Sequence, residues 1–269
     1  MPSPETPKVN TSEASIARVY DAVIGGKDNF EVDREVAEVT LGVHPAMPRI
    51  TKSGRRWLVR VVSYLADRCG MDQFLDAGAG LPTVQNTHEV AQRYQPHATV
   101  VYIDNDPAVH AYGRALLASN DTTFFSAADL TQPAEVVADP QVRELNFHRA
   151  MALMQCLTMH HIEDETDPWR IMRGYVDALP RGSYVAFSHL CMPDDNPEGA
   201  AVAQSIEEAW RASSMGTGRF RSPEHIRAML DGLELLEPGL VPLERWWPEG
   251  PLSTSAADEV AVGALAYKP

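Results

Sequence analysis

Acidic residues stand at the ends of three successive apolar runs in the sequence. They are Asp76 in the run Gln73 to Ala77, Asp104 after Thr99 to Ile103, and Asp129 after Thr122 to Ser126. Because the carboxyl ends of parallel strands meet at one edge of a sheet, we expect the three carboxylates to converge on one crevice. Any one of them could cap a helix or a turn instead. Three acids at three successive strand ends favour a shared ligand.

The strongest local pattern is the glycine turn after the first run. Gly78, Ala79 and Gly80 let the backbone approach a ligand closely. The dinucleotide fingerprint needs a third glycine, where a helix opens to meet a pyrophosphate, but this chain has Thr83 there. Asp76 before the turn repels pyrophosphate and suits a ligand with an ammonium and a sulfonium group. The pattern therefore favours S-adenosylmethionine, with an ordinary tight turn as the alternative.

The two later strand ends fit the rest of such a nucleoside. Asp104, followed by Asn105, stands about 20 residues past the glycine turn, where a carboxylate accepts hydrogen bonds from ribose hydroxyls. Asp106 is assigned to capping the helix that follows. Asp129 and Leu130 are expected near the adenine edge, although Asp129 could equally cap the next helix.

Candidate proton acceptors follow the fourth and fifth apolar runs. His160 and His161 come after Ala150 to Leu157, and His189 follows the fifth run. Leu157 itself is expected at the cofactor. A histidine can act as a general base near neutral pH, and for each of the three a structural role is equally open. Adjacent histidines could also bind a metal ion, but the sequence shows no further ligands beside them, so no metal site is predicted.

The order of the apolar runs predicts an α/β fold. Five runs alternate with helix-length segments, which calls for a parallel sheet covered on both faces. The last two runs, Leu233 to Val241 and Glu259 to Tyr267, have no helix between them and are expected to pair antiparallel. We predict a Rossmann-like, mostly parallel sheet of seven strands with an antiparallel C-terminal strand. Expected helices include Ile16 to Val23, ending at Gly25-Gly26, Arg55 to Arg68, and an insertion at 194–221.

Composition excludes several classes of protein. The 269 residues are 44% hydrophobic and carry a formal net charge of −14, which repels a phosphate backbone, so no nucleic-acid partner is predicted. No apolar run reaches the roughly 18 to 20 residues of a membrane span, and the N-terminus lacks the order of a signal peptide. We expect no membrane partner and a cytoplasmic location. The three isolated cysteines are interpreted as buried hydrophobes.

Longer blocks of the sequence resemble an actinobacterial family of S-adenosylmethionine-dependent methyltransferases, formerly a domain of unknown function. The likeness covers the chain from Ala14 to Tyr267. The blocks that carry it are Ser15 to Phe30, Asp33-Arg34, Gln73 to Thr83, His88 to Gln92, Val101 to Pro107 and Gly232 to Pro242. The resemblance implies a class I methyltransferase fold, with Asp76, Gly78 and Gly80 at the cofactor, Asp104 at the ribose and Asp129 near the adenine.

The resemblance also gives a role to the segment Gly25 to Phe30. It implies a helical lid at residues 13–54, before the methyltransferase domain at 55–269. The N-terminus is rich in Pro, Ser and Thr, which predicts a disordered tail at 1–12. Lys27 and Asn29 in this lid are expected to bind the methionine carboxylate of the cofactor. A helix C-cap at Gly25 or Gly26 is an alternative, and both can hold.

Together these patterns predict an enzyme that methylates a small molecule. The cofactor's methyl group is already activated, so the main task of the protein is to align the acceptor. We expect Tyr20 and the three histidines to surround it, with Trp246 or Trp247 unless these tryptophans pack on the last strands. The predicted acceptor is a secondary metabolite such as an indole-containing or small cyclic peptide natural product, by analogy of fold.

Two other functions stay open at this point. One is a non-catalytic regulatory module that binds S-adenosylmethionine or its demethylated product, which a pocket closed to acceptors would indicate. The other is a nicotinamide-dependent oxidoreductase, against which the missing third glycine and the lid argue. A homodimer is the default oligomeric state for such enzymes.

Overall fold

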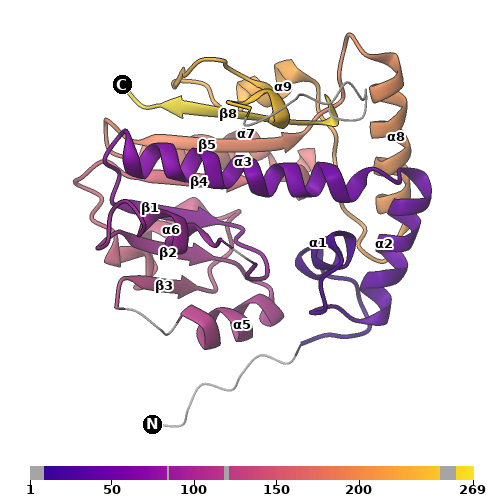
Figure 1. Cartoon of the computed structure of the whole chain (residues 1–269), viewed down its shortest axis with the longest axis horizontal. Coiled ribbons are helices and arrows are strands. Elements are labelled where there is room, and N and C mark those ends of the chain that lie inside the picture. Colours follow the sequence, from indigo (N-terminus) through magenta and orange to yellow (C-terminus); the bar gives the residue numbers. More distant parts are fainter. Residues whose placement is uncertain (1–8, 84, 118–120, 249–258) are drawn as a thin grey trace.

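An eight-stranded sheet runs through the middle of the molecule (Figure 1). The computed structural model describes residues 9–83, 85–117, 121–248 and 259–269. The strands are β1 (Gln73–Ala77), β2 (Thr99–Ile103), β3 (Thr123–Ser126), β4 (Ala152–Cys156), β5 (Tyr184–Leu190), β6 (Glu234–Leu235), β7 (Val241–Pro242) and β8 (Ala261–Tyr267). Their order is β3-β2-β1-β4-β5-β8-β6, and β7 also pairs with β8.

The direction of the strands sets the place of a ligand site. β1 to β5 are parallel, and β8 runs antiparallel to β5, β6 and β7. The chain builds β1, β2 and β3 in one direction and then returns to place β4 on the other side of β1. Open α/β sheets bind ligands at such a switch point, beyond the carboxyl ends of the strands.

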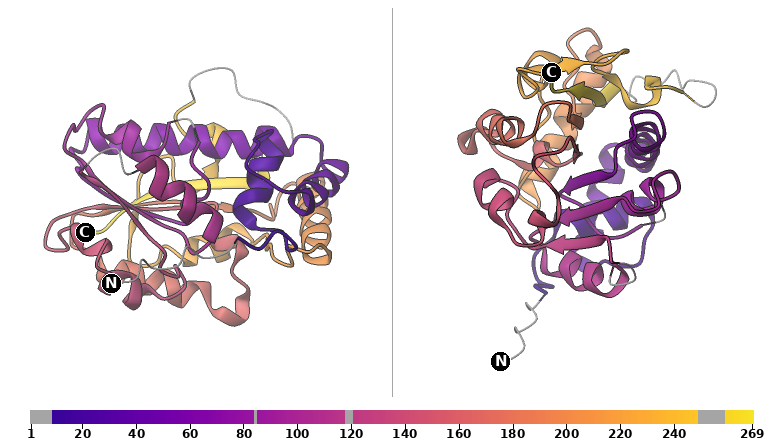
Figure 2. Two further views of the ribbon diagram at one scale, coloured as in Figure 1. Left: turned by 90° about the horizontal axis from the view of Figure 1, so that it is seen from below. Right: turned by 90° about the vertical axis from the view of Figure 1, so that its left-hand side faces the viewer.

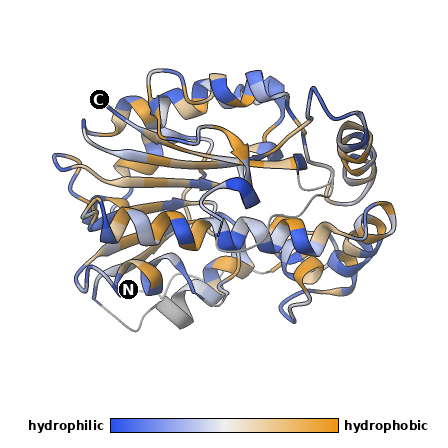
Figure 3. Cartoon of the chain, turned by 45° about the horizontal axis from the view of Figure 1, so that its top comes forward, coloured by the Kyte–Doolittle hydropathy of each residue, from blue (hydrophilic) through white to orange (hydrophobic). Residues whose placement is uncertain are grey.

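Helices cover both faces of the sheet, as the right-hand view of Figure 2 shows. They are α1 (Ile16–Ile24), α2 (Glu31–Val43), α3 (Met47–Asp67), α4 (Thr87–Ala91), α5 (Pro107–Leu117), α6 (Pro133–Ala138), α7 (Pro168–Ala178), α8 (Pro197–Ala212) and α9 (Pro223–Ala228). Strand residues alternate between the faces, so Phe74 packs with α3 and α4 while Leu75 packs with α6, α7 and α9. Apolar residues accordingly follow the strands in Figure 3. No helix in the described ranges is long and apolar enough to span a bilayer.

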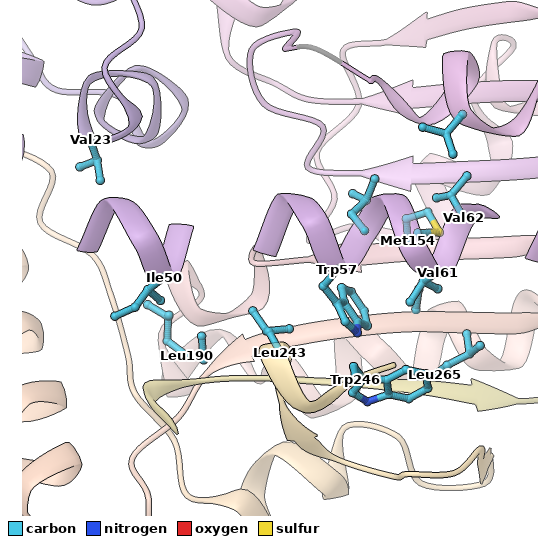
Figure 4. Packing of buried hydrophobic residues seen from close by; sticks show 14 of the residues in the cluster. Val23, Ile50, Trp57, Val61, Val62, Met154, Leu190, Leu243, Trp246 and Leu265 are labelled. Atoms are coloured by element: carbon cyan, nitrogen blue, oxygen red, sulfur yellow. The ribbon is translucent and has the colours of Figure 1, made fainter. Parts of the chain in front are cut away.

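The packing of α3 on the sheet accounts for one of the late tryptophans (Figure 4). Trp57 and Trp246 are fully buried and meet edge to face, with ring centroids 6.3 Å apart. The indole nitrogen of Trp246 donates to the carbonyl of Gly263 at 2.8 Å. A Cβ on Gly263 would lie 2.8 Å from Trp57, so this close approach requires glycine. Trp246 therefore packs on β8, as one of the two interpretations of the sequence had it.

The sheet differs from the prediction in its number of strands. The run Leu233 to Val241 forms two short strands, β6 and β7, rather than one, which gives eight strands in place of seven. The reason is a turn between them, in which the amide of Gly239 donates to the carbonyl of Leu236 and Gly239 has a φ of 84°. The antiparallel pairing with the C-terminal strand is as predicted.

The N-terminal part also differs in detail. α3 begins at Met47, so one helix passes through the predicted boundary between residues 54 and 55. α2 has no counterpart in the sequence prediction. α8 lies within the expected insertion at 194–221. Of the predicted disordered tail, residues 1–8 lie outside the described residues.

Two buried aspartates hold α1 and α2 together as the lid. Gly25, at a φ of 84°, ends α1 as predicted, and a Cβ on Gly26 would collide with the carboxylate of Asp21. That carboxylate accepts the amide of Asp28 at 2.9 Å. Asp33 pairs with Arg18 at 2.8 Å, and both side chains are buried. The glycine-rich segment is thus a tight turn between two helices at the end of the sheet (Figure 1).

Candidate active site

The carboxyl ends of β1 to β4 open into a cavity of about 560 Å³, which α1 lines from the opposite side. Asp76, Asp104 and Asp129 all lie on its lining, as do Asn105 and Leu130. The remaining lining residues are Ala14, Ser15, Ile16, Ala17, Tyr20, Gly54, Arg55, Leu58, Gly78, Ala79, Gly80, Leu81, Thr83, Asp106, Pro107, Thr131, Cys156, Leu157, Thr158, His161, Ile162 and Met215. The structure therefore brings the three predicted strand-end carboxylates to one crevice beneath the start of the chain.

The glycine turn is fixed to the neighbouring strand by its backbone. The amides of Gly78 and Ala79 both donate to the carbonyl of Ile103, at 2.8 and 3.0 Å. Gly78 has a φ of 81°, and a Cβ there would lie 2.2 Å from the methyl carbon of Thr158. Gly80 has a φ of 64°, and a Cβ there would enter open space. The turn thus packs against Thr158 at Gly78 and presents bare backbone to the cavity at Gly80.

Asp104 is held by two backbone amides. Its carboxylate oxygens accept the amides of Gly80, at 2.9 Å, and Asp106, at 3.0 Å. Burial raises the pKa of Asp104 to about 6. Each oxygen keeps a further lone pair, so the carboxylate can accept two hydroxyl hydrogen bonds from the cavity. Asp106 caps α5 as predicted, since its carboxylate accepts the amide of Ala108 at 2.7 Å.

The other two carboxylates have contrasting surroundings. Asp76 is buried and accepts the hydroxyl of Thr87 at 2.6 Å. Burial raises the pKa of Asp76, and this hydrogen bond opposes the rise. Asp129 is exposed, and its side chain accepts the amide of Thr131 at 2.8 Å. Asp129 therefore forms a turn and lines the cavity, and it does not cap the next helix, α6, whose N-cap is Gln132.

Arg55 is a cavity residue that the sequence analysis missed. It reaches the lining from α3, and one of its guanidinium nitrogens donates to the carbonyl of Gln85 at 2.6 Å. Its positive charge acts on Asp76 and Tyr20. Among the described residues of the lining it is the one lysine or arginine. Its position depends on the phase of α3, which begins at Met47 rather than at residue 55.

Two hydrogen bonds tie α1 and the turn after it to α5 and the residue before it. The hydroxyl of Ser15 donates to the carboxylate of Asp106, next to the cavity. At the far end of the turn, the hydroxyl of Tyr112 on α5 donates to Asp28 at 2.7 Å. α1 is thereby held over the carboxyl edge of the sheet, so ligand entry requires that these contacts open or that the ligand passes beside them.

Lys27 and Asn29 do not lie on the cavity lining. Lys27 is exposed. The amide nitrogen of Asn29 donates to Asp21 at 2.8 Å, and its oxygen accepts Arg34 at 3.0 Å. The structure therefore places these residues in the turn between α1 and α2, away from the cavity at which they were predicted to bind the methionine carboxylate.

The predicted acceptor-site residues separate into two groups. Tyr20 and His161 line the cavity. His160 and His189 are buried outside the lining, and His189 is bonded on both ring nitrogens, to the carbonyl of Leu190 and to Arg221. The structure therefore does not bring these two predicted residues to the cavity, because the ends of β4 and β5 turn them into the protein interior. Trp247 is also outside the lining and packs on Tyr64.

Burial keeps the histidines uncharged. It lowers the pKa of His161 to about 3 and that of His189 to about 3, and it lowers the pKa of His160 well below its usual range. Within the described residues, no group of three His, Cys, Asp or Glu side chains could hold a metal ion. His161 is thus a neutral imidazole at the cavity, with its Nδ1 3.0 Å from the hydroxyl of Thr217.

Comparison with known proteins decides between the possible ligands of this cavity. The model of the S-adenosyl methyltransferase family matches residues 2–269. The chain belongs to this family. Among curated protein sequences no match is found.

Solved structures agree with the family assignment. A candidate methyltransferase from Thermobifida fusca YX is 38% identical, with a TM-score of 0.90 and coverage of 96% of both chains. A DUF574 family protein from Streptomyces avermitilis is 35% identical, with a TM-score of 0.91, and the match covers 97% of this chain and 100% of that one. The N-methyltransferase NodS from Bradyrhizobium japonicum shares the fold, with a TM-score of 0.50 at 14% identity and coverage of 83% and 99%.

The methyltransferase uses S-adenosylmethionine, and the cavity fits that cofactor. Gly80 leaves room for a ligand beside the backbone, and the buried carboxylate of Asp104 can accept hydroxyl donors. The carboxylate of Asp76 and the guanidinium of Arg55 lie on the same lining and could meet a cationic group and a carboxylate, respectively. These are the groups that a nucleoside bearing an amino acid presents.

Proposed function

We propose that this methyltransferase methylates a small, electrically neutral acceptor that binds at the β4 end of the cavity. Apolar side chains line that end, namely Leu58, Leu157, Ile162 and Met215. Their polar neighbours are the phenol of Tyr20 and the imidazole of His161, both uncharged. An ionised acceptor would lose its hydration against these apolar walls, which is costly, and in this proposal the positive charge of Arg55 is already paired with the carboxylate of the cofactor.

The cofactor site lies on the other side, toward β2 and β3. In the proposal Asp104 binds the ribose hydroxyls and Asp129 and Leu130 lie at the adenine. Asp76 faces the ammonium group, and Arg55 takes the methionine carboxylate in place of Lys27 and Asn29. When bound, S-adenosylmethionine supplies a methyl group activated by a positively charged sulfur.

His161 carries the chemical part of the proposal. Its neutral ring does not repel a cationic cofactor, and it can accept a hydrogen bond from an N–H or O–H of the acceptor. A heteroatom becomes far more acidic once it is methylated, so a weak base is sufficient to take its proton. The hydroxyl of Tyr20 donates to the carbonyl of Thr51 at 3.3 Å, which holds the phenol at the cavity wall.

The acceptor in this proposal is a natural product with an indole or a small cyclic peptide. The apolar walls and the two aromatic rings support an acceptor with an aromatic or amide surface. A cytoplasmic location and a homodimer belong to the same proposal. Light scattering of the purified protein tests the second.

Calorimetry followed by methyl transfer tests the proposal. S-adenosylmethionine and S-adenosylhomocysteine should bind, and NAD should not. With cofactor carrying a radiolabelled methyl group, label should pass into the small-molecule fraction of an actinobacterial extract, and less should pass with His161→Ala. Binding without any transfer to that fraction would favour a regulatory module. Transfer to protein or nucleic acid alone would refute a small acceptor.

A further inference from the structure

A buried tryptophan connects the lid to the histidine at the cavity. Trp210 lies near the end of α8, which runs beside α2 (Figure 1). Its indole nitrogen donates to the hydroxyl of Thr40 on α2 at 2.7 Å, and both side chains are buried. A hydrogen bond sealed from water in this way fixes the distance between the two helices.

The position of α2 is in turn tied to the cavity wall. The carboxylate of Asp33 on α2 accepts the amide of Ser15 at 2.9 Å and pairs with Arg18 of α1. Ser15 and the following residues of α1 line the cavity. Any displacement of the lid therefore moves α2 relative to Trp210.

The ring face of Trp210 stacks against the histidine pair. Its ring lies within 24° of parallel to that of His161, with centroids 5.9 Å apart, and within 29° of parallel to that of His160. His160 and His161 are themselves 4.1 Å apart. The indole thus packs against the His161 ring and restricts the orientation of that ring.

A returning segment completes the contact. A Cβ on Gly218 would lie 2.6 Å from the indole, and Gly218 has a φ of 138°, so the chain crosses Trp210 where glycine is required. The preceding Thr217 bonds the ring of His161, and the amide of Arg219 donates to the carbonyl of His160 at 2.7 Å. The same indole therefore touches the lid, the histidine pair and the segment that holds them.

We propose that Trp210 is a positioning residue that transmits the placement of the lid helix α2 to His161. This inference rests on the proposed function, in which His161 faces the acceptor. It adds that His161 has its working orientation when α2 is docked on Trp210. The enzyme would then pair a closed lid with a correctly placed base.

Four variants separate this link from a general loss of stability. Thr40→Val removes the acceptor of the indole hydrogen bond at nearly constant volume, and Thr40→Ser retains it. Trp210→Phe retains a ring and removes the donor. Ser205→Ala is the control on α8, because this exposed hydroxyl bonds within its own helix, to the carbonyl of Ala201.

The readouts are amide exchange at Arg219 and the ring nitrogen signals of His161 in histidine-labelled protein, both without ligand. Exchange at Arg219 should rise about threefold to tenfold relative to β4 in Thr40→Val and Trp210→Phe, the effect of one buried hydrogen bond. The Nδ1 signal of His161 should move toward that of a ring without a partner. Thr40→Ser and Ser205→Ala should match the parent protein.

Each outcome decides a separate question. Unchanged Arg219 exchange and His161 signals in Thr40→Val and Trp210→Phe would overturn the link. An equal rise in the exchange rate of the Arg219 amide in Thr40→Ser would also overturn the link, because that variant retains the indole hydrogen bond. So would an equal rise in the exchange of the β4 amides, because it would indicate a general loss of stability. If these variants behave as expected but no small molecule is methylated, the link stands and the proposed function fails.

Discussion

Asp104 and Gly80 are joined directly, because the amide of Gly80 donates to the carboxylate of Asp104 at 2.9 Å. The hydrogen bond connects the turn after β1 to the end of β2. The glycine turn and the predicted ribose ligand therefore form one unit before any cofactor binds. Burial raises the pKa of Asp104 to about 6, so the unliganded protein holds a carboxylate at an energetic cost.

Asp104→Asn should weaken cofactor binding. The amide is a weaker acceptor for hydroxyl groups, so affinity for S-adenosylhomocysteine should fall about 10- to 100-fold by calorimetry. The unliganded protein should gain no stability at pH 7.5, because the Asn nitrogen cannot accept one of the two backbone amides that the carboxylate accepts, which offsets the removal of a buried charge. Asp139→Asn, at a carboxylate that only turns the chain before residues 141 and 142, is the control. Unchanged affinity in Asp104→Asn would contradict the ribose role.

Binding should also weaken in acid because of the same residue. Asp104 is ionised above about pH 6 and protonated below it. Affinity for S-adenosylhomocysteine should therefore be constant from pH 7 to 8 and decline below pH 6. His161, whose pKa is about 3, adds no step between pH 5 and 8. A decline that persists in Asp104→Asn would assign the titration to another group.

Stability should fall in acid for a different reason. Burial lowers the pKa of His161 and His189 to about 3, whereas an unfolded histidine takes up a proton near pH 6.5. Above pH 6.5 both histidines are neutral in the folded and the unfolded protein and do not change the free energy of unfolding. As the pH falls from 6.5 toward 3, only the unfolded protein binds these protons, so the folded protein becomes less stable. Between pH 7.5 and pH 5, each of these histidines should lower the free energy of unfolding by about 2 kcal/mol. Asp104, whose pKa is raised in the folded protein, should increase it by about 1 kcal/mol over the same range. Urea unfolding at pH 7.5 and 5 measures the difference.

A matched variant identifies the source of that loss. His189→Gln should reduce the difference between the two pH values by about 2 kcal/mol, whatever it does to stability at pH 7.5. An equal difference in the variant and the parent protein would mean that His189 is not the buried neutral group described here.

Arg55 and Lys27 are alternative candidates for binding the methionine carboxylate of the cofactor, and single substitutions distinguish them. Arg55→Met should weaken S-adenosylhomocysteine about 10- to 100-fold, the effect of losing a charge-assisted hydrogen bond to its carboxylate. It should leave the affinity for adenosine, which has no carboxylate, unchanged. Lys27→Ala should alter neither. The opposite result would support Lys27 as the residue that binds the methionine carboxylate, as predicted from the sequence.

The strand ends were predictable because their positions follow from topology. Once five apolar runs alternate with helices, the residues after them must meet at one edge, and Asp76, Asp104 and Asp129 do so. The position of a residue along a strand also predicts the face of the sheet that it occupies, because successive side chains point to opposite faces. His189 has the same parity as Phe187 on β5, which faces the cluster beneath α7, so its burial away from the cavity could have been inferred.

The lid residues and Arg55 were not predictable in the same way. Asn29 looks like a ligand in the sequence, but its hydrogen-bonding groups are used within the lid, by Asp21 and Arg34. Arg55 is one of several arginines on a helix whose start the sequence did not reveal. Which of them reaches the cavity depends on the crossing of α3 over the sheet, a property of packing and not of spacing.

The buried ion pair between the two lid helices is the last feature that yields a prediction. Asp33 is fully buried, and besides Arg18 it accepts the amides of Ser15 and Phe30 at 2.9 and 2.8 Å. Asp33→Ala leaves the buried guanidinium of Arg18 without its carboxylate, and breaking such a pair typically costs about 3–5 kcal/mol. That exceeds the stability of many local units, so the lid should detach before the sheet unfolds.

Detachment has a distinct signature. In Asp33→Ala, amides of α1 and α2 should exchange at least about 100-fold faster, whereas those of β1 and β4 should change far less. Affinity for S-adenosylhomocysteine should fall as well, because α1 forms one wall of the cavity. Glu35→Ala removes an exposed acid from the same helix and should behave as the parent protein. Uniform loss of protection in Asp33→Ala would mean that α1 and α2 unfold with the sheet and do not act as a separate lid.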